Sequence, residues 1–155
     1  MNKLNKNILT ILLLFLCIIN IGCNNNKQEE HKIKIEEIII TIPQDFTKNE
    51  NIFISNDNLN KIEIEKINDE NTKIEDTKQK IKDEYKNKNI ELTEIIIKKD
   101  IPKISGLVGI EKDNTIHIYF IENENNKIKM TCHGNNDNSA LLFRSIAKNI
   151  IVKQN

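Results

Sequence analysis

The chain has 155 residues, which suits one domain of ordinary size, and its 23 lysines and arginines balance its 23 aspartates and glutamates. A formal net charge of zero does not provide the basic face that nucleic-acid binding needs, so nucleic acid is excluded as a partner. The chain has no tryptophan and few aromatic residues, so we expect a core built mainly of isoleucine.

The N-terminal stretch has the pattern of an export signal. Lys3 and Lys6 precede an apolar run, residues 8–19, in which Thr10 is the one polar residue. A run of about 12 residues fits a signal peptide and is shorter than the ~20 residues of a membrane-spanning helix. Removal of the two lysines leaves 21 cations against 23 acids, a net charge of −2 on the remainder.

The pair Gly22-Cys23 follows this run and resembles the lipobox of bacterial lipoproteins, with Asn20 where that family usually has Leu, Ile or Val. The resemblance implies cleavage after Gly22 and attachment of diacylglycerol and palmitate to Cys23. More than one acyl chain gives stable anchoring in a bilayer. We therefore expect a protein anchored in the bacterial cell membrane or outer membrane, with its domain on the extracytoplasmic side. An ordinary secretory signal or an uncleaved anchor is the alternative.

The expected organisation has three parts: a signal peptide at 1–22, a lipidated N-terminus and polar tether at 23–32, and a single domain at 33–155. Cys17 would leave with the signal and Cys23 would be acylated. Only Cys132 then remains, so the domain cannot form an internal disulfide.

The first part of the domain is predicted to be β-structure. Residues 33–42 are rich in β-branched side chains and predict one strand, bulged or shifted in register at Glu36-Glu37 and ended by Pro43. Residues 51–55 and 61–67 predict two more strands around a turn at 56–58. The last of these alternates with period two, which is typical of a strand buried on one face.

A helix is predicted over residues 73–86. Thr72 and Glu75 fit a capping box, and the apolar positions Ile74, Ile81 and Tyr85 share one narrow face. The rest of the helix is charged and is expected to be solvated. Pairs at i, i+4 spacing are expected between Asp76 and Lys80 and between Glu84 and Lys88.

The second part predicts four strands and a closing helix. The strands are residues 94–99, 104–111, 115–121 and 127–132, and the last three form an antiparallel meander because their turns are short and polar. Residues 133–138 are expected to be a loop, with Asp137 or Asn138 as helix cap. The helix buries a stripe and ends the chain, while Arg144 and Lys148 face away. The stripe is Leu142, Phe143, Ile146, Ala147 and Ile150.

This order predicts an α+β fold, a mostly antiparallel sheet flanked by two main helices, and it resembles the PsbP-like family with its Mog-type α/β/α sandwich. Residues 42–46 resemble the family's Ile-Pro-x-x-aromatic pattern, with Phe46 in place of the usual Trp. Further resemblance lies in residues 80–85, 95–106, 119–122 and 142–150. It implies a non-catalytic binding or assembly module, and the family's photosynthetic role is not carried over.

The most reactive residue types give no catalytic cluster. Cys132 and His133 are adjacent on a predicted strand, so their side chains point to opposite faces and Cys132 is expected in the core. His117 lies opposite Ile116 and Ile118 and should face solvent or a helix. A metal site would need His117 and His133 to converge with Asp137 or Cys132. We predict no catalytic residue, no metal and no cofactor.

Three functions follow from this reading. The preferred one is a membrane-anchored, non-catalytic binding or assembly protein whose partners are the lipid bilayer, through acylated Cys23, and an envelope protein. The second is an extracytoplasmic metal-binding protein or enzyme that uses His117, Cys132 and His133. The third is a surface-exposed lipoprotein that interacts with a host.

Overall fold

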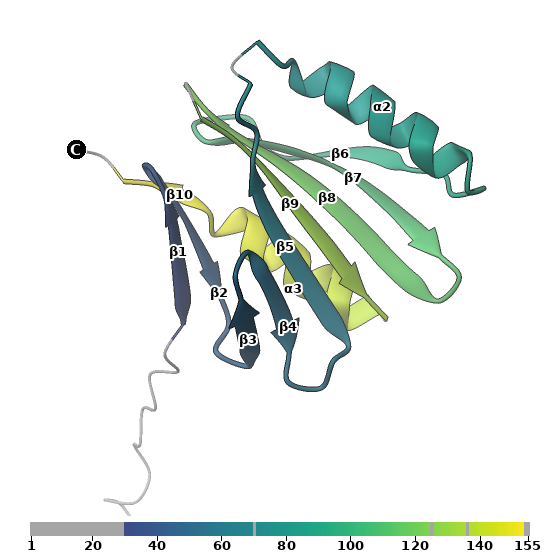
Figure 1. The fold of residues 1–155 in the computed structure, drawn as a ribbon, viewed down its shortest axis with the longest axis horizontal. Helices are drawn as coiled ribbons and strands as arrows, with labels where there is room; N and C mark the ends of the chain where they lie inside the picture. The colour runs from purple at the N-terminus through teal and green to yellow at the C-terminus, as the bar shows by residue number, and fades with distance from the viewer. Residues whose placement is uncertain (1–29, 70, 125, 136, 154–155) are drawn as a thin grey trace, which may run out of the picture.

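The computed structural model describes residues 30–69, 71–124, 126–135 and 137–153, which form two antiparallel sheets and two helices (Figure 1). Every strand pair is antiparallel. The large sheet runs, in spatial order, β3 (Phe46–Asn49), β4 (Ile52–Ser55), β5 (Asn60–Lys66), β9 (Asn126–Gly134), β8 (Asn114–Asn123), β7 (Lys103–Glu111) and β6 (Thr93–Lys98). The small sheet runs β1 (His31–Ile35), β2 (Ile38–Ile42) and β10 (Ile151–Val152), and the helices are α2 (Ile74–Lys86) and α3 (Asp137–Lys148).

The large sheet separates two hydrophobic cores. One core joins it to α3 and to β2 of the small sheet, through residues such as Phe143, Ile146 and Ile40. The other lies between the sheet and α2 and includes Ile74 and Leu107. Figure 1 shows α3 behind the large sheet and α2 along its β6–β8 side. The predicted fold class, a mostly antiparallel sheet flanked by two helices, is confirmed.

Strand β8 contributes to both cores, because successive side chains of a strand point to opposite faces. Ile116, Ile118 and Phe120 belong to the α2 core, whereas Tyr119 and Ile121 belong to the α3 core. Its neighbours β7 and β9 complete the predicted meander. Strand β9 continues through Gly134, so the loop predicted at 133–138 begins later than expected.

The predicted single strand at 33–42 is wrong, because these residues form the hairpin of β1 and β2. Glu36 has φ 53°, and this left-handed conformation permits the turn at Glu36-Glu37 that folds Ile35 back beside Ile38. The hairpin begins at His31, so the last two residues of the predicted tether lie in β1. His31 Nε2 donates a hydrogen bond to the carbonyl oxygen of Phe46 (2.7 Å).

Two short strands were missing from the sequence prediction. Strand β3 has one buried residue, Phe46, and its other three positions are exposed, so it carries no alternating pattern. Strand β10 extends the chain past α3, which was expected to be the last element, and pairs with β2 through Ile151 and Val152. Both strands are defined by their pairing with neighbours rather than by their own side chains.

The helix predicted at 73–86 is confirmed as α2, but its predicted capping box is wrong. Lys73 occupies the N-cap position and makes no capping hydrogen bond with its side chain. The Thr72 hydroxyl donates instead to Asp69 Oδ2 (3.0 Å), so the preceding turn uses the group that was expected to cap the helix.

The closing helix agrees with its predicted apolar stripe. In α3 the side chains of Phe143, Ile146 and Ala147 are buried, and Arg144 and Lys148 are exposed. Among the residues that the structure describes, no helix combines the length and apolar character needed to cross a membrane. The predicted signal peptide and Cys23 lie outside the described residues.

Phe143 tests the packing of α3 on the sheet. Its side chain is fully buried, so Phe143→Ala should lower the free energy of unfolding by about 3–5 kcal/mol through lost burial and the cavity left behind. Leu141→Ala is the control on the same helix, since Leu141 is 68% exposed, and it should change stability by less than about 0.5 kcal/mol. Urea denaturation measures both, and equal losses would contradict this packing.

Candidate functional site

His117 is the buried imidazole of the large sheet and lies beneath α3. It is 7% exposed, and its Nδ1 lies 3.0 Å from the hydroxyl oxygen of Tyr119, two residues along β8. The ring meets the edge of Phe143 of α3, with centroids 5.7 Å apart. The prediction that His117 faces away from Ile116 and Ile118, toward a helix or solvent, is confirmed, and the element that it faces is the helix α3.

The proton positions of this pair follow from burial. Tyr119 is fully buried, and within the described residues its hydroxyl has no hydrogen-bond partner other than His117. A buried hydroxyl donor left unpaired is costly, so the Tyr119 O–H donates to Nδ1. Nδ1 is then the acceptor, and the neutral ring carries its proton on Nε2.

Burial also keeps His117 neutral. The pKa of His117 falls from 6.5 to about 4, mainly because the ring is buried and to a smaller extent because of the nearby positive charge of Arg144. The pKa of Tyr119 is raised, first by burial and then by the neighbouring Cys132, with Arg144 acting in the opposite sense. At neutral pH the pair is therefore an uncharged hydrogen-bonded unit.

A cavity of about 570 Å³ opens beside His117, and we call it the α3 groove. Its sheet side is formed by Thr93 of β6, Val108 and Ile110 of β7, and Thr115 and His117 of β8. Asp137 and Ala140 of α3 form the opposite side, and Glu91 precedes β6 at the rim. Nδ1 is occupied by Tyr119, so Nε2–H is the group His117 offers to this cavity.

The predicted His117, Cys132 and His133 cluster does not form. Cys132 is the cross-strand neighbour of His117 and shares its face, whereas His133 pairs with Ile116 and points to the other face. His117 and His133 therefore cannot converge on one metal ion. Among the described residues, no group of three or more His, Cys, Asp or Glu side chains is placed to hold a metal.

Cys132 and His133 have separate environments, as their adjacency on a strand predicted. The Cys132 thiol is fully buried in the α3 core, and burial raises its pKa far above the ordinary value. His133 is half-buried; burial lowers its pKa, as does Lys61, while Glu111 and Glu63 act in the opposite direction. Of the other ligands considered, only Asp137 lines the same cavity as His117.

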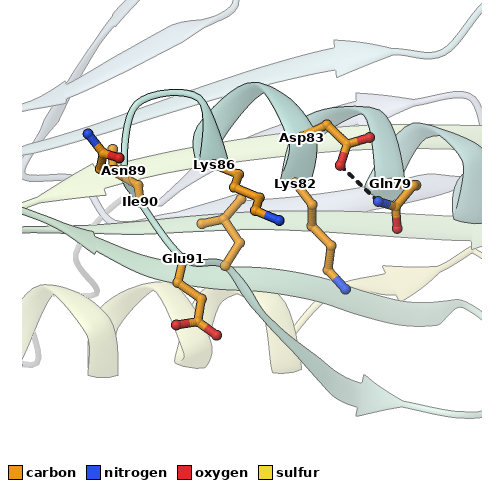
Figure 2. A pocket seen from close by; sticks show the side chains of 8 residues that line it. Gln79, Lys82, Asp83, Lys86, Asn89, Ile90 and Glu91 are labelled. Carbon is orange, nitrogen blue, oxygen red and sulfur yellow. Dashed lines mark hydrogen bonds between the residues drawn. The ribbon is translucent and has the colours of Figure 1, made fainter.

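A second hollow, of about 610 Å³, lies between the C-terminal half of α2 and the segment that follows it. Lys82 and Lys86 of the helix and Ile90 and Glu91 of the following segment line it, and Gln79 donates to Asp83 (3.0 Å) (Figure 2). The side chains that α2 contributes to this hollow are all polar or charged, in agreement with the solvated face predicted for α2.

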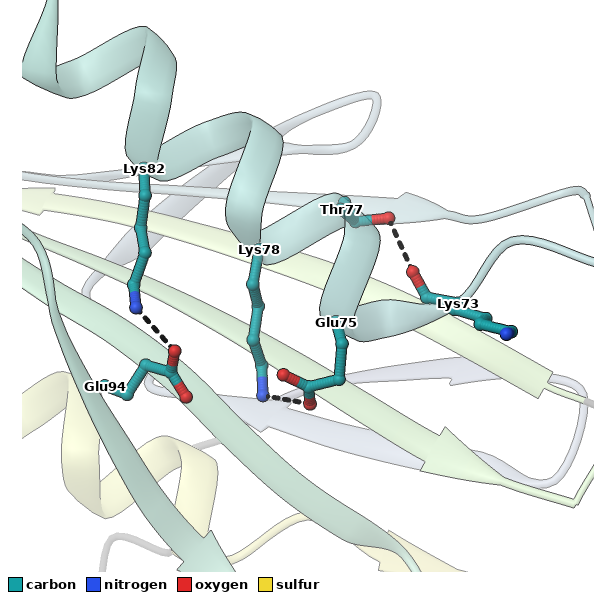
Figure 3. A network of polar contacts seen from close by, with 6 residues as sticks. All are labelled: Lys73, Glu75, Thr77, Lys78, Lys82 and Glu94. Carbon is teal, nitrogen blue, oxygen red and sulfur yellow. Dashed lines mark hydrogen bonds and ion pairs between the residues drawn. The ribbon is translucent and has the colours of Figure 1, made fainter.

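The same helix carries a chain of ion pairs along its sheet side (Figure 3). Lys78 is 5% exposed and donates to Glu75 Oε1 (2.8 Å), and Lys82 Nζ lies 2.5 Å from Glu94 Oε1 of β6. The predicted i, i+4 pairs are absent from the ion pairs of the described residues. These contacts use Lys78 and Lys82 in ion pairs, and we place the candidate site in the α3 groove, where a buried imidazole lines the cavity.

Comparisons with known proteins leave the family undetermined. No protein-family model matches the chain, and no curated protein matches it. Among solved structures, the fold is similar to the crystal structure of the Ran-binding protein Mog1p of Saccharomyces cerevisiae, with a TM-score of 0.45 and 6% sequence identity. The match covers 81% of this chain and 96% of that chain. Membership of the PsbP-like family stays a prediction.

The groove was not predicted from the sequence. Alternation placed His117 on the face opposite Ile116 and Ile118, but it could not show which element covers that face. The available signal was a histidine and a tyrosine two residues apart in an otherwise apolar strand, because such residues share a face and can bond to each other.

The lowered pKa of His117 makes stability depend on pH. The unfolded chain binds a proton near pH 6.5 and the folded chain only near pH 4, so stability is present above this window and falls as the pH decreases through it. The loss should reach roughly 3 kcal/mol at most. Urea unfolding at pH 7 and pH 4 should show a smaller loss for His117→Gln than for the unchanged chain. Equal losses in the two proteins would refute the assignment.

Burial should make Cys132 inert. In a chain with Cys17→Ser and Cys23→Ser, the folded thiol should react with a disulfide reagent at least about 100-fold more slowly than in urea, because reaction requires the core to open. Absorbance of the released thiolate follows the rate. Comparable rates in the two states would contradict a sequestered core thiol.

Proposed function

We propose that this protein is a membrane-anchored binding protein without catalytic activity, held to the bilayer by acylated Cys23 with its domain on the extracytoplasmic side. The observation that supports binding is the α3 groove: a cavity in which the one deeply buried side chain, His117, presents an N–H group while the core holds its ring. A fixed donor in a partly apolar cavity suits recognition of a ligand.

The state of His117 favours binding over catalysis. A general base works best with a pKa near the working pH, and its ring is usually oriented by a carboxylate. His117 has a pKa of about 4 and bonds to the hydroxyl of Tyr119. The neighbouring Cys132 thiol lies in the core with a raised pKa, so it is a poor nucleophile.

Anchoring is supported by the sequence before the domain. Lys3 and Lys6, the apolar run and Gly22-Cys23 occur in the order of a lipoprotein signal. The first strand begins at His31, eight residues after Cys23. An extended chain spans at most 3.3–3.6 Å per residue, so the domain would start within about 30 Å of the bilayer surface.

Replacement of the acylated residue tests the anchor. Cys23→Ser should move the protein from the membrane fraction to the soluble fraction and abolish incorporation of labelled palmitate, since the acyl chains supply the attachment. Cys17→Ser is the matched control in the same segment and should leave both unchanged. Retention of Cys23→Ser in the membrane, or release of Cys17→Ser, would overturn lipidation at Cys23.

A further inference from the structure

The α3 groove has three chemical features that together define a ligand. The first is apolar surface: Val108 and Ile110 of β7 lie opposite Ala140 of α3, and Ile110 is 67% exposed. A large exposed apolar side chain at a cavity favours a ligand with an apolar body, because contact removes its surface from water.

The second feature is the Nε2–H of His117. The Tyr119 hydroxyl occupies Nδ1, and Nε2 has no hydrogen-bond partner among the described residues. The residue is more than nine-tenths buried and lines the groove, where water can reach Nε2–H. A ligand that covers this N–H and displaces the water must supply an acceptor in its place, such as a carbonyl or hydroxyl oxygen.

The third feature is the charge of the lining. Glu91 and Asp137 lie at the groove and are exposed, and its described lining includes no lysine or arginine. Arg144 is on α3, one turn beyond Ala140 and outside this lining, where its charge disfavours a proton on His117. The two carboxylates therefore favour an ammonium group at their own part of the lining, whereas the charge that acts at His117 is that of Arg144.

We propose that the α3 groove binds a small amphipathic amine, a molecule with a branched apolar body, a carbonyl or hydroxyl oxygen and an ammonium group. The apolar body contacts Val108, Ile110 and Ala140, the oxygen accepts from His117 Nε2–H, and the ammonium group lies near Glu91 and Asp137. This assignment rests on the proposed binding function and gives it a ligand class.

The full-length protein in detergent micelles, with labelled methyl groups and histidine rings, tests the assignment by NMR titration. The probe is leucinamide, which has an isobutyl group, an amide carbonyl and an ammonium group. It should shift the methyl signals of Val108, Ile110 and Ala140 and the Nε2 signal of His117. Glycinamide, which lacks the isobutyl group, should bind about tenfold more weakly.

Charge is tested with the anion of N-acetylleucine, which keeps the isobutyl group and a carbonyl but reverses the charge. It should bind more weakly than leucinamide by at least about fivefold. The double variant Glu91→Gln with Asp137→Asn should weaken the binding of leucinamide by about two- to fivefold, which is the range for exposed ion pairs. Asp76→Asn, an exposed acid on α2, is the matched control and should have no effect.

His117→Leu should weaken the binding of leucinamide about tenfold because it removes the donor. His117→Gln retains an N–H group and should lose less affinity. If either substitution of His117 disturbs folding, the double variant at Glu91 and Asp137 still tests the assignment. Equal binding of the anion, or an unchanged affinity in the double variant, would overturn the ligand class. Shifts confined to Ile90 and Leu92, which line the hollow beside α2, would overturn the site. Neither result affects the fractionation of Cys23→Ser. A wrong ligand class can therefore be distinguished from a wrong assignment of the lipid anchor.

Discussion

The fold depends on burial of strand β8 on both of its faces. From Ile116 to Ile121 every side chain is buried, and alternate residues enter the α2 core and the α3 core. Both faces of such a strand must be covered by other elements, because covering one face would leave half of its apolar side chains in water. The meander of β7, β8 and β9 and the helix on each face together meet this requirement.

The candidate site follows from the same constraint. His117 is the histidine within this buried run, so it enters the α3 side with its polar atoms in need of partners. Tyr119, the next residue on that face, supplies one partner through its hydroxyl. Nε2 of His117 lies at the α3 groove. The residue itself is buried, whereas Glu91 and Asp137 of the groove are exposed to solvent.

The sequence predicted the elements that carry a pattern of their own. Alternation found β5, β8 and β9, and helical spacing found α2 and the stripe of α3. The sequence prediction failed where a backbone conformation or a strand pairing determines the structure. Glu36 adopts a positive φ although it is not glycine, and Phe46 begins an edge strand whose residues do not alternate. The groove needs α3 to lie over β6, β7 and β8, a contact between distant segments that no local pattern contains.

The two helices are attached to the sheet in different ways, and the difference bears on where a ligand can be held. The buried side chains of α2 are Ile74 and Lys78, and Ile81 and Tyr85 are only partly buried against the sheet. The ion pair of Lys82 with Glu94 also joins α2 to β6, but it is partly exposed and stabilises by about 0–1 kcal/mol. Helix α3 buries Phe143, Ile146 and Ala147 in the larger core and should open later than α2. A site held on α3 and β8 therefore has the rigid support that a precisely placed donor requires.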